Sequence, residues 1–249
     1  MPENKILADK VALVIGGSRG IGAAIVRRMA ADGAAVAFTF ASSPLKAEQV
    51  VAEVERGQGR ALAIRADSAD PKAVQAAVTQ TVEAHGRLDV LVCNSGILTR
   101  GTIDAYPLED FDRMVAVNVR SVFAAAQAAS HHMRQGARII VIGSVVANRT
   151  AFPGASVYSM TKGAVASLVR GMAIDLAPRG ITVNTIQPGP TATDMNPADG
   201  PHVETLKALL PVGRLGESGE VAGFVSYLAG PEAGFITGAS LNIDGGYTL

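Results

Sequence analysis

Short apolar runs recur along the chain and alternate with longer segments rich in alanine. Most of these runs carry apolar residues on both alternating faces, which is typical of strands that are buried on both sides. A half-exposed sheet would instead alternate apolar with polar positions. The runs predict seven strands, at residues 11–15, 35–40, 60–66, 89–93, 138–142, 181–186 and 240–243.

The segments between these runs predict helices. Asp70 before Pro71, and Ser218 before Gly219 and Glu220, are typical of helix starts. The predicted helices cover residues 21–31, 44–56, 71–85, 108–135, 156–177 and 219–229. This repeated alternation favours an α/β fold, in which a parallel sheet has helices on both faces.

Two architectures fit such an alternation. A TIM barrel needs eight strand–helix units, whereas the glycine pattern after the first strand favours a Rossmann-type doubly wound sheet. A long irregular segment with three prolines, residues 187–200, follows the sixth strand, and a loop of this length is usually a lid or a binding loop. We expect a single domain over residues 1–249, with a loop insertion at about 188–212.

Composition and charge limit the classes of partner. Lys plus Arg and Asp plus Glu are both 22, so no net field attracts nucleic acid or an anionic membrane. The single cysteine, Cys93, cannot form an intrachain disulfide, and Asp9 and Lys10 interrupt the first apolar run, unlike a secretory signal. No uncharged stretch reaches the roughly 20 apolar residues of a membrane helix. We therefore expect a soluble cytoplasmic protein with a small-molecule partner.

A glycine-rich turn follows the first predicted strand. Gly16 permits a tight turn, Gly20 permits close approach of a pyrophosphate, and Gly22 permits close packing of the helix on the strand. The helix N-terminus then offers unpaired N–H groups to the anion. This arrangement predicts dinucleotide binding. The expected cofactor-binding residues of the turn are Gly16, Ser18, Arg19, Gly20, Ile21 and Gly22.

The end of the second strand indicates which dinucleotide is preferred. NAD sites usually have a carboxylate there for the ribose 2′-hydroxyl, and this sequence has none. Thr39, Ser42 and Ser43 are available to donate to a 2′-phosphate, and Arg19 is available to pair with it. A solvated loop charge is the alternative interpretation of Arg19. The pattern favours NADP(H) over NAD(H).

Polar residues also follow the third strand. Asp67 and Ser68 are placed to contact the adenine, or to cap the helix that begins after Asp70, and the two roles are compatible. Four histidines occur in the chain, but none has the i, i+4 spacing to another histidine or the clustered carboxylates of a metal site. We therefore expect no metal ion.

Tyr158 and Lys162 are four residues apart, which places a phenol and an ammonium on one helix face. A neighbouring ammonium favours the phenolate, so we expect the pKa of Tyr158 to be lowered from its ordinary value near 10, toward the range useful for proton transfer. Ser144 ends the fifth strand fourteen positions before the tyrosine, where its hydroxyl is able to hold a carbonyl oxygen beside the phenol.

With these residues the sequence resembles the short-chain dehydrogenase/reductase family over essentially its full length. The order and spacing of the matching motifs make the resemblance specific. They are the glycine turn Gly16–Gly22, Cys93-Asn94-Ser95-Gly96, Asn118, Ser144, Tyr158-x-x-x-Lys162, Pro188-Gly189 with Thr193, and Ile243-Asp244-Gly245-Gly246.

The resemblance implies a role for each catalytic residue. Tyr158 would be the general acid/base, Lys162 would lower its pKa and bind the nicotinamide ribose, and Ser144 would orient the carbonyl. Asn118, which could otherwise be an ordinary polar helix residue, would hold a water that links Lys162 to solvent. The further cofactor-binding residues implied are Asn94, Gly96, Tyr158, Lys162, Pro188, Gly189, Thr191 and Thr193.

Two positions depart from the family pattern. Ile15 stands where the family usually has threonine, and Cys93-Asn94-Ser95-Gly96 replaces Asn-Asn-Ala-Gly. Both positions brace the central sheet, so the departures affect local hydrogen bonding and leave the chemistry unchanged. Cys93 is interpreted as a small buried hydrophobe.

The substrate is expected to be a moderately apolar carbonyl compound. The expected pocket wall is Leu98, Val145, Val146, Met195 and Leu209, all of which are equally compatible with core positions, and Asn148 is the nearby polar candidate for specificity. The resemblance also leaves open a second function, a sensor that binds a cyclic dinucleotide or NADP(H) without turnover. A third reading, a structural subunit, rests only on the two apolar helices at 108–135 and 156–177, which the family commonly pairs between subunits. We expect a homotetramer.

Overall fold

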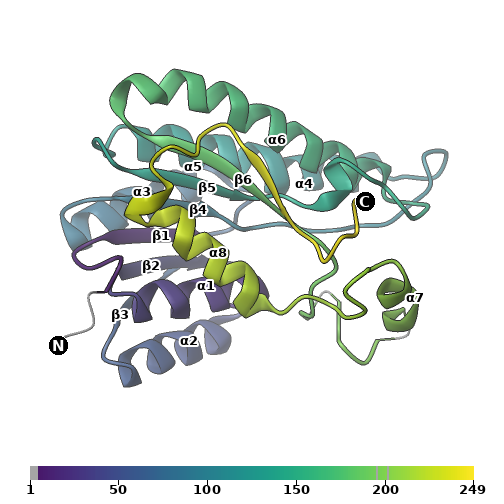
Figure 1. Cartoon of the computed structure of the whole chain (residues 1–249). Coiled ribbons are helices and arrows are strands. Elements are labelled where there is room, and N and C mark those ends of the chain that lie inside the picture. The colour runs from purple at the N-terminus through teal and green to yellow at the C-terminus, as the bar shows by residue number, and fades with distance from the viewer. Residues whose placement is uncertain (1–4, 195, 201) are drawn as a thin grey trace.

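The computed structural model describes residues 5–194, 196–200 and 202–249 (Figure 1). Within this part of the chain, seven strands form one parallel sheet in the order β3-β2-β1-β4-β5-β6-β7. The chain leaves β1 toward β2 on one side and later returns to β4 on the other, so the strand order reverses between β1 and β4. The strands are β1 Val11–Ile15, β2 Ala35–Phe40, β3 Arg60–Arg65, β4 Val90–Cys93, β5 Arg138–Ile142, β6 Thr182–Pro188 and β7 Ser240–Ile243.

Helices cover both faces of the sheet. Figure 1 shows α1, α2 and α8 on one face and α3, α4, α5 and α6 on the other, while α7 stands apart near the C-terminus. Their bounds are α1 Gly20–Ala31, α2 Pro44–Arg56, α3 Pro71–His85, α4 Leu108–Val115, α5 Ser121–Ser130, α6 Ser156–Leu176, α7 Val203–Ala208 and α8 Ser218–Ala229. This is the Rossmann-type doubly wound architecture that the sequence predicts.

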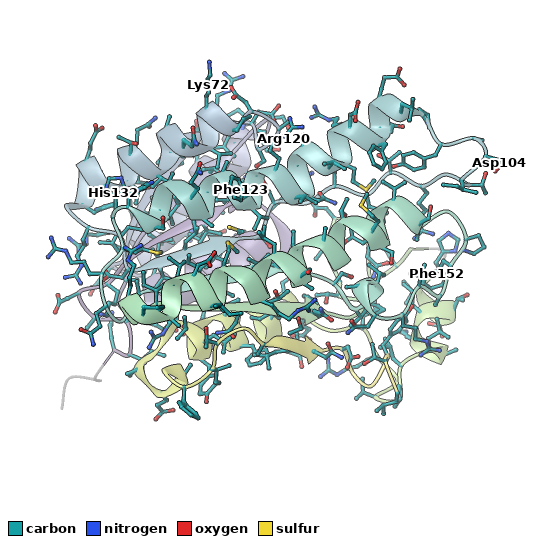
Figure 2. The ribbon with its side chains drawn as sticks, turned by 90° about the horizontal axis from the view of Figure 1, so that it is seen from above. Lys72, Asp104, Arg120, Phe123, His132 and Phe152 are labelled. Atoms are coloured by element: carbon teal, nitrogen blue, oxygen red, sulfur yellow. The ribbon has the colours of Figure 1, made fainter. Side chains whose placement is uncertain are left out.

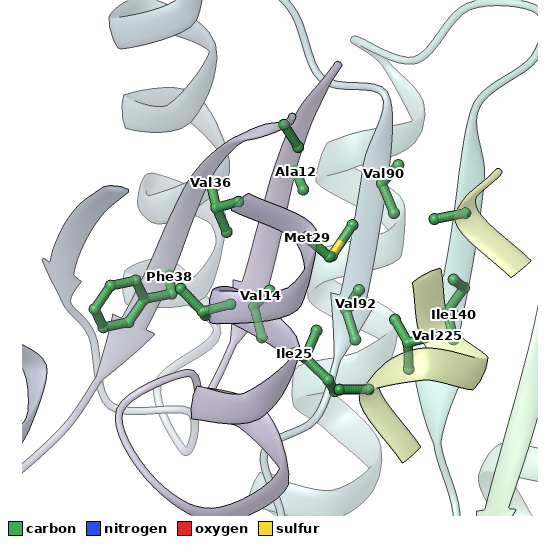
Figure 3. Packing of buried hydrophobic residues seen from close by; sticks show 14 of the residues in the cluster. Ala12, Val14, Ile25, Met29, Val36, Phe38, Val90, Val92, Ile140 and Val225 are labelled. Carbon is green, nitrogen blue, oxygen red and sulfur yellow. The ribbon is translucent and has the colours of Figure 1, made fainter. Parts of the chain in front are cut away.

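The core is built from strands that are apolar on both sides. On the first face, Ile25 and Met29 of α1 and Val225 of α8 pack against strand residues such as Val14 and Val92 (Figure 3). These side chains are fully buried. Burying one such side chain contributes about 1.5–3 kcal/mol, and truncating Met29 to alanine would cost about 2–5 kcal/mol. Cys93 is buried in the second cluster, and its burial raises the pKa of the thiol to about 12.

The predicted strand positions agree with the structure to within two residues at each end, whereas one helix differs in extent. The predicted helix at 108–135 is α4 and α5 joined by a π-helical turn at Ala116–Arg120, and it ends at Ser130. Arg179 satisfies carbonyl groups at this end, donating to those of Ser130 and Met133. The continuous apolar pattern gave no sign of either feature.

Two helix starts can be compared with the prediction. Asp70 caps α3 as expected, since its side chain accepts from the backbone N–H of Lys72 at 2.9 Å. The cap residue of α8 is Glu217 and not Ser218, because Glu220 reaches back to accept from the Glu217 backbone N–H at 2.8 Å.

The parallel arrangement brings the carboxyl ends of all strands to one edge of the sheet. The segments after β1, β4, β5 and β6 therefore meet where ligands bind in open α/β sheets. Figure 2 shows the loops that carry Asp104 and Phe152 at one end of the molecule and His132 toward the other. Among the described residues, no helix combines the length and apolar character needed to cross a membrane.

Candidate active site

The turn after β1 is shaped by glycines. Gly16 and Gly20 have φ of +84° and +53°, in the left-handed region that favours glycine. A Cβ at Gly22 would lie 2.0 Å from the Gly16 carbonyl oxygen, so only glycine fits there. Arg19 is the N-cap residue of α1, and no side chain accepts a hydrogen bond from the backbone N–H groups of the first turn. This turn also holds no acidic residue. The helix thus presents open N–H groups, which suit an anionic group.

Thr39 occupies a different place from the one expected. It is 1% exposed, and its hydroxyl accepts a hydrogen bond from the Gly16 backbone N–H at 2.9 Å. Because β2 is paired with β1, this hydroxyl lies against the backbone of the glycine turn. It is therefore buried and is not available at the surface to a 2′-phosphate. Ser42 and Arg19 are exposed and Ser43 is partly exposed.

The segment after β4 braces the same turn. Asn94 donates from Nδ2 to the Gly16 carbonyl at 2.7 Å, and the backbone N–H groups of Asn94 and Ser95 both donate to the Ile15 carbonyl. The unusual serine at 95 has a partner of its own, because the hydroxyls of Ser95 and Ser68 lie 2.7 Å apart. The departures at 15 and 93–96 are thus accommodated by local hydrogen bonding.

Asp67 takes part in a turn ahead of α3. Its carboxylate accepts from the Ala69 backbone N–H at 2.9 Å, while Asp70 provides the helix cap itself. Asp67 is exposed and Ser68 is partly exposed at the end of β3. Both residues therefore have local hydrogen-bond partners and still border the carboxyl edge of the sheet.

Ser144, Tyr158 and Lys162 converge at the end of β5. The Ser144 side chain lies close enough to the Tyr158 phenol to lower its pKa through hydrogen bonding. The Lys162 ammonium lies 5.7 Å from the centroid of the Tyr158 ring and donates to the Ile142 carbonyl at 2.9 Å. Lys162 is 4% exposed, so this cation is held in a desolvated position. A phenol, a hydroxyl and an ammonium thus meet in one place, as the spacing predicts.

The ionisation of this group differs from the expectation. Burial raises the pKa of the Tyr158 phenol, and the hydrogen bond with Ser144 only opposes this effect. Burial also lowers the pKa of Lys162 to about 8. The expected lowering of the tyrosine pKa by lysine is therefore wrong for this arrangement. Desolvation dominates, because the ammonium lies beside the ring and donates to a backbone carbonyl.

Asn118 lies in the π-helical turn between α4 and α5 and is buried. Its side chain pairs with the backbone of Ile97, accepting from the N–H at 2.9 Å and donating to the carbonyl at 3.0 Å. It also donates to Thr161 at 3.1 Å. A Cβ at Gly96 would lie 3.5 Å from Lys162 Nζ and 3.7 Å from Asn118 Oδ1, so the glycine leaves a small gap between these two groups.

The loop after β6 lies against the C-terminal segment and over the glycine turn. A Cβ at Gly189 would lie 2.7 Å from Cα of Asp244, and the Gly189 N–H donates to the Ile243 carbonyl. Thr191 is nearly buried and donates to the Gly189 carbonyl at 2.9 Å. The methyl carbon of Thr193 is 3.5 Å from the Cβ position of Gly20. The loop that begins at Pro188 therefore lies against the glycine turn through Thr193.

The expected pocket wall is only partly free for a substrate. Val145 is buried in a small cluster with Tyr247, and Leu209 packs against that cluster, so these two residues hold the loop in place. Asn148 donates from its side-chain amide to Gln187 at 2.7 Å, so this donor is already engaged. Leu98 and Val146 are partly exposed, and Met195 lies outside the described residues.

Two residues near the site were missed by the sequence reasoning. Arg149 donates to the Tyr247 carbonyl and its guanidinium lies 5.1 Å from the centroid of the Tyr247 ring. Tyr247 is 1% exposed, which ties the C-terminal segment to the cluster under α7. No local pattern could reveal this contact, since the two residues are 98 positions apart.

Comparisons with known proteins show which family the chain belongs to. Residues 15–248 match the family model described as enoyl-(acyl carrier protein) reductase. The chain is 57% identical to a short-chain dehydrogenase/reductase from Serratia marcescens BCRC 10948, with a TM-score of 0.97 over 98% of this chain and 100% of that one. This chain belongs to the short-chain dehydrogenase/reductase family.

Two further relatives of this short-chain dehydrogenase/reductase bear on its ligands. A short-chain dehydrogenase from Burkholderia cenocepacia J2315, solved in complex with NADP, is 48% identical with a TM-score of 0.96, over 98% of this chain and 100% of that one. The cyclic-di-GMP-binding biofilm dispersal mediator protein of Escherichia coli (strain K12) is 44% identical over 96% of this chain and 97% of that protein.

Proposed function

We propose that this chain is an NADP(H)-dependent oxidoreductase that reduces a ketone or aldehyde to an alcohol, or catalyses the reverse reaction. The observation that carries the proposal is the convergence of Ser144, Tyr158 and Lys162 at the edge of the sheet where the glycine turn lies. The NADP bound to the Burkholderia relative supports the choice of cofactor. The lack of a carboxylate at the end of β2 supports it as well.

The residues of the site have separate roles in this reaction. When bound, the nicotinamide supplies a hydride to the carbonyl carbon. The Tyr158 hydroxyl donates its proton to the carbonyl oxygen, while the Ser144 hydroxyl donates a hydrogen bond to the same oxygen. The buried Lys162 ammonium binds the nicotinamide ribose. The raised pKa of Tyr158 keeps the phenol protonated at neutral pH, which suits the reductive direction.

Asn118 and Gly96 support a route for the proton that Tyr158 must regain. The gap beside Gly96 separates the Lys162 ammonium from the Asn118 side-chain oxygen. We assign to this gap a water that accepts from Lys162 and donates to Asn118 Oδ1, which retains a lone pair beside its bond from Ile97. Such a water would link the buried ammonium to solvent.

The test is a Tyr158→Phe variant, which removes the hydroxyl and keeps the ring. NADPH oxidation with a panel of ketones and aldehydes should fall at least about a hundredfold, because general acid catalysis typically contributes 10²–10⁴-fold. The affinity for NADPH, measured by calorimetry, should stay within twofold to threefold of the wild-type value. Near-normal turnover in this variant would refute the role of Tyr158.

A second function is a sensor that binds a cyclic dinucleotide or NADP(H) without significant turnover. The 44% identity to the Escherichia coli biofilm dispersal mediator favours it. The intact set of Asn118, Ser144, Tyr158 and Lys162 favours an enzyme, since a binding protein needs no proton relay. No NADPH consumption across a broad carbonyl panel, together with binding of cyclic-di-GMP, would favour the sensor.

The quaternary arrangement and location form the rest of the proposal. We treat residues 1–249 as one dinucleotide-binding domain with a substrate loop at about 188–212, acting in the cytoplasm. A homotetramer paired through α5 and α6 is supported by the exposed Phe123 of α5 and Ile174 of α6, at 49% and 76% exposure. Light scattering at the mass of a monomer would contradict the tetramer.

A further inference from the structure

An ion pair joins the two sides of the proposed cofactor site. Lys46 in the first turn of α2 donates to the Asp194 carboxylate at 2.5 Å, although the two residues are 148 positions apart. Asp194 follows Thr193, whose methyl carbon lies against Gly20 of the glycine turn. Lys46 lies three residues after Ser43, the N-cap of α2, in the segment that follows β2. The pair therefore connects the loop after β6 with the segment where the 2′-group of a dinucleotide is expected.

Two cations act on the same carboxylate. The hydrogen bond and charge of Lys46, and more weakly the charge of Arg19, lower the pKa of Asp194. The N-terminus of α2 adds to this positive environment, because its first turn holds no acidic residue and the Ser43 side chain does not cap it. The carboxylate of Asp194 thus lies in a region of positive potential created by Lys46 and Arg19.

The ion pair between Lys46 and Asp194 is exposed and weak. The side chains of Lys46 and Asp194 are 49% and 54% exposed, and ion pairs in such positions contribute only about 0–1 kcal/mol to stability. A phosphate monoester carries a charge of about −1.5 to −2 at neutral pH and has three acceptor oxygens. It is therefore a stronger partner for the two cations than one carboxylate.

We propose that Lys46, together with Arg19, binds the 2′-phosphate of NADP(H). In the free protein Lys46 forms an ion pair with Asp194, and the 2′-phosphate replaces the Asp194 carboxylate as its partner. This inference rests on the proposed binding of NADP(H). Asp194 then acts as an internal competitor of the 2′-phosphate alone. NADH has no 2′-phosphate and therefore leaves the Lys46–Asp194 ion pair intact. Only NADP(H) breaks the contact between α2 and the loop after β6.

Two substitutions of opposite expected effect test this competition in the full-length protein. Dissociation constants for NADPH and NADH are measured by calorimetry for the wild type, Asp194→Asn, Lys46→Gln and the double variant. Asp194→Asn should tighten NADPH binding about threefold to fivefold, the range expected for the loss of a weak ion pair. Lys46→Gln should weaken NADPH binding about tenfold. The affinity for NADH should change by less than twofold in both. Asp194→Asn should have a smaller effect once Lys46 is replaced, because only the weaker influence of Arg19 on Asp194 remains.

Glu53→Gln is the matched control, because it removes another exposed ion pair of α2, the one with Arg27. It should leave both affinities unchanged. Weaker NADPH binding in Asp194→Asn, or equal changes for NADPH and NADH in either variant, would overturn the exchange. Wild-type protein that binds neither dinucleotide would refute the proposed function as well, whereas NADPH binding with an unaltered NADPH/NADH ratio in Asp194→Asn refutes the exchange alone.

Discussion

The side-chain amide of Asn118 donates a hydrogen bond to the Thr161 hydroxyl at 3.1 Å, and this hydroxyl donates in turn to the Tyr158 carbonyl at 2.8 Å. Thr161 is fully buried. One hydroxyl therefore connects the π-helical turn between α4 and α5 with the first turns of α6, which carry Tyr158 and Lys162, the residues to which we assign proton transfer and ribose binding. Thr161 is a positioning residue in this arrangement, since it acts on the reacting groups through Asn118 and the backbone of α6.

Replacing Thr161 by valine should lower both stability and turnover. The substitution keeps the shape but leaves an N–H of Asn118 without a partner, and an unsatisfied buried donor costs about 1–3 kcal/mol. Urea unfolding should show a loss of this size, and kcat should fall while NADPH affinity stays unchanged. Thr161→Ser keeps the hydroxyl and should restore kcat. Valine and serine variants with the same kcat would show that the hydroxyl has no part in positioning Tyr158.

The buried ammonium of Lys162 should make stability depend on pH. The pKa of Lys162 is about 8 in the folded protein, whereas its ordinary value, which applies to the unfolded chain, is 10.5. Between these two pH values the unfolded chain therefore binds more protons at Lys162 than the folded protein does. Lys162 should therefore contribute a rise in the free energy of unfolding with pH over this window, by up to about 1.4 kcal/mol per pH unit. The raised pKa values of Cys93 and Tyr158 act in the opposite sense, above their ordinary values of 9.0 and 10.0.

The comparison with Lys162→Met isolates this contribution. Urea unfolding of both proteins from pH 8 to pH 9.5 should show the wild type gaining stability relative to the variant across the range. The difference between the two curves is the measured quantity, because all other titrating groups are shared. Parallel curves would mean that the ammonium of Lys162 is not desolvated in the folded protein.

The features that the sequence predicts well are those that depend on neighbouring residues. The strand at 11–15 was placed correctly because burial on both faces leaves a continuous apolar run. The glycine turn was evident because its steric demands fall on residues six positions apart. The pairing of Tyr158 with Lys162 followed from helical spacing.

The features that sequence reasoning missed depend on contacts between distant segments. Asn118 in the π-helical turn accepts a hydrogen bond from Ile97, which is 21 positions away. Thr39 supports Gly16 because of strand order, and Asn148 is engaged by Gln187 from another strand. The direction of the Tyr158 pKa shift depends on how deeply the phenol is buried. The spacing of residues along the sequence does not give this burial.

The glycine turn gives a prediction that separates steric demand from helix propensity. Gly22→Ala places a methyl group 2.0 Å from the Gly16 carbonyl oxygen and 2.5 Å from Asn94 Nδ2, so the backbone of the turn must shift. We expect a loss of about 1–3 kcal/mol in the free energy of unfolding and a loss of dinucleotide binding. Gly219→Ala in the first turn of α8 is the matched control, because nothing lies within 4 Å of its Cβ position. Alanine is the better helix former, so this variant should gain roughly 0.5–1 kcal/mol and keep full binding. If Gly22→Ala bound NADPH as the wild type does, close packing of α1 on the turn would not be a condition for holding the pyrophosphate.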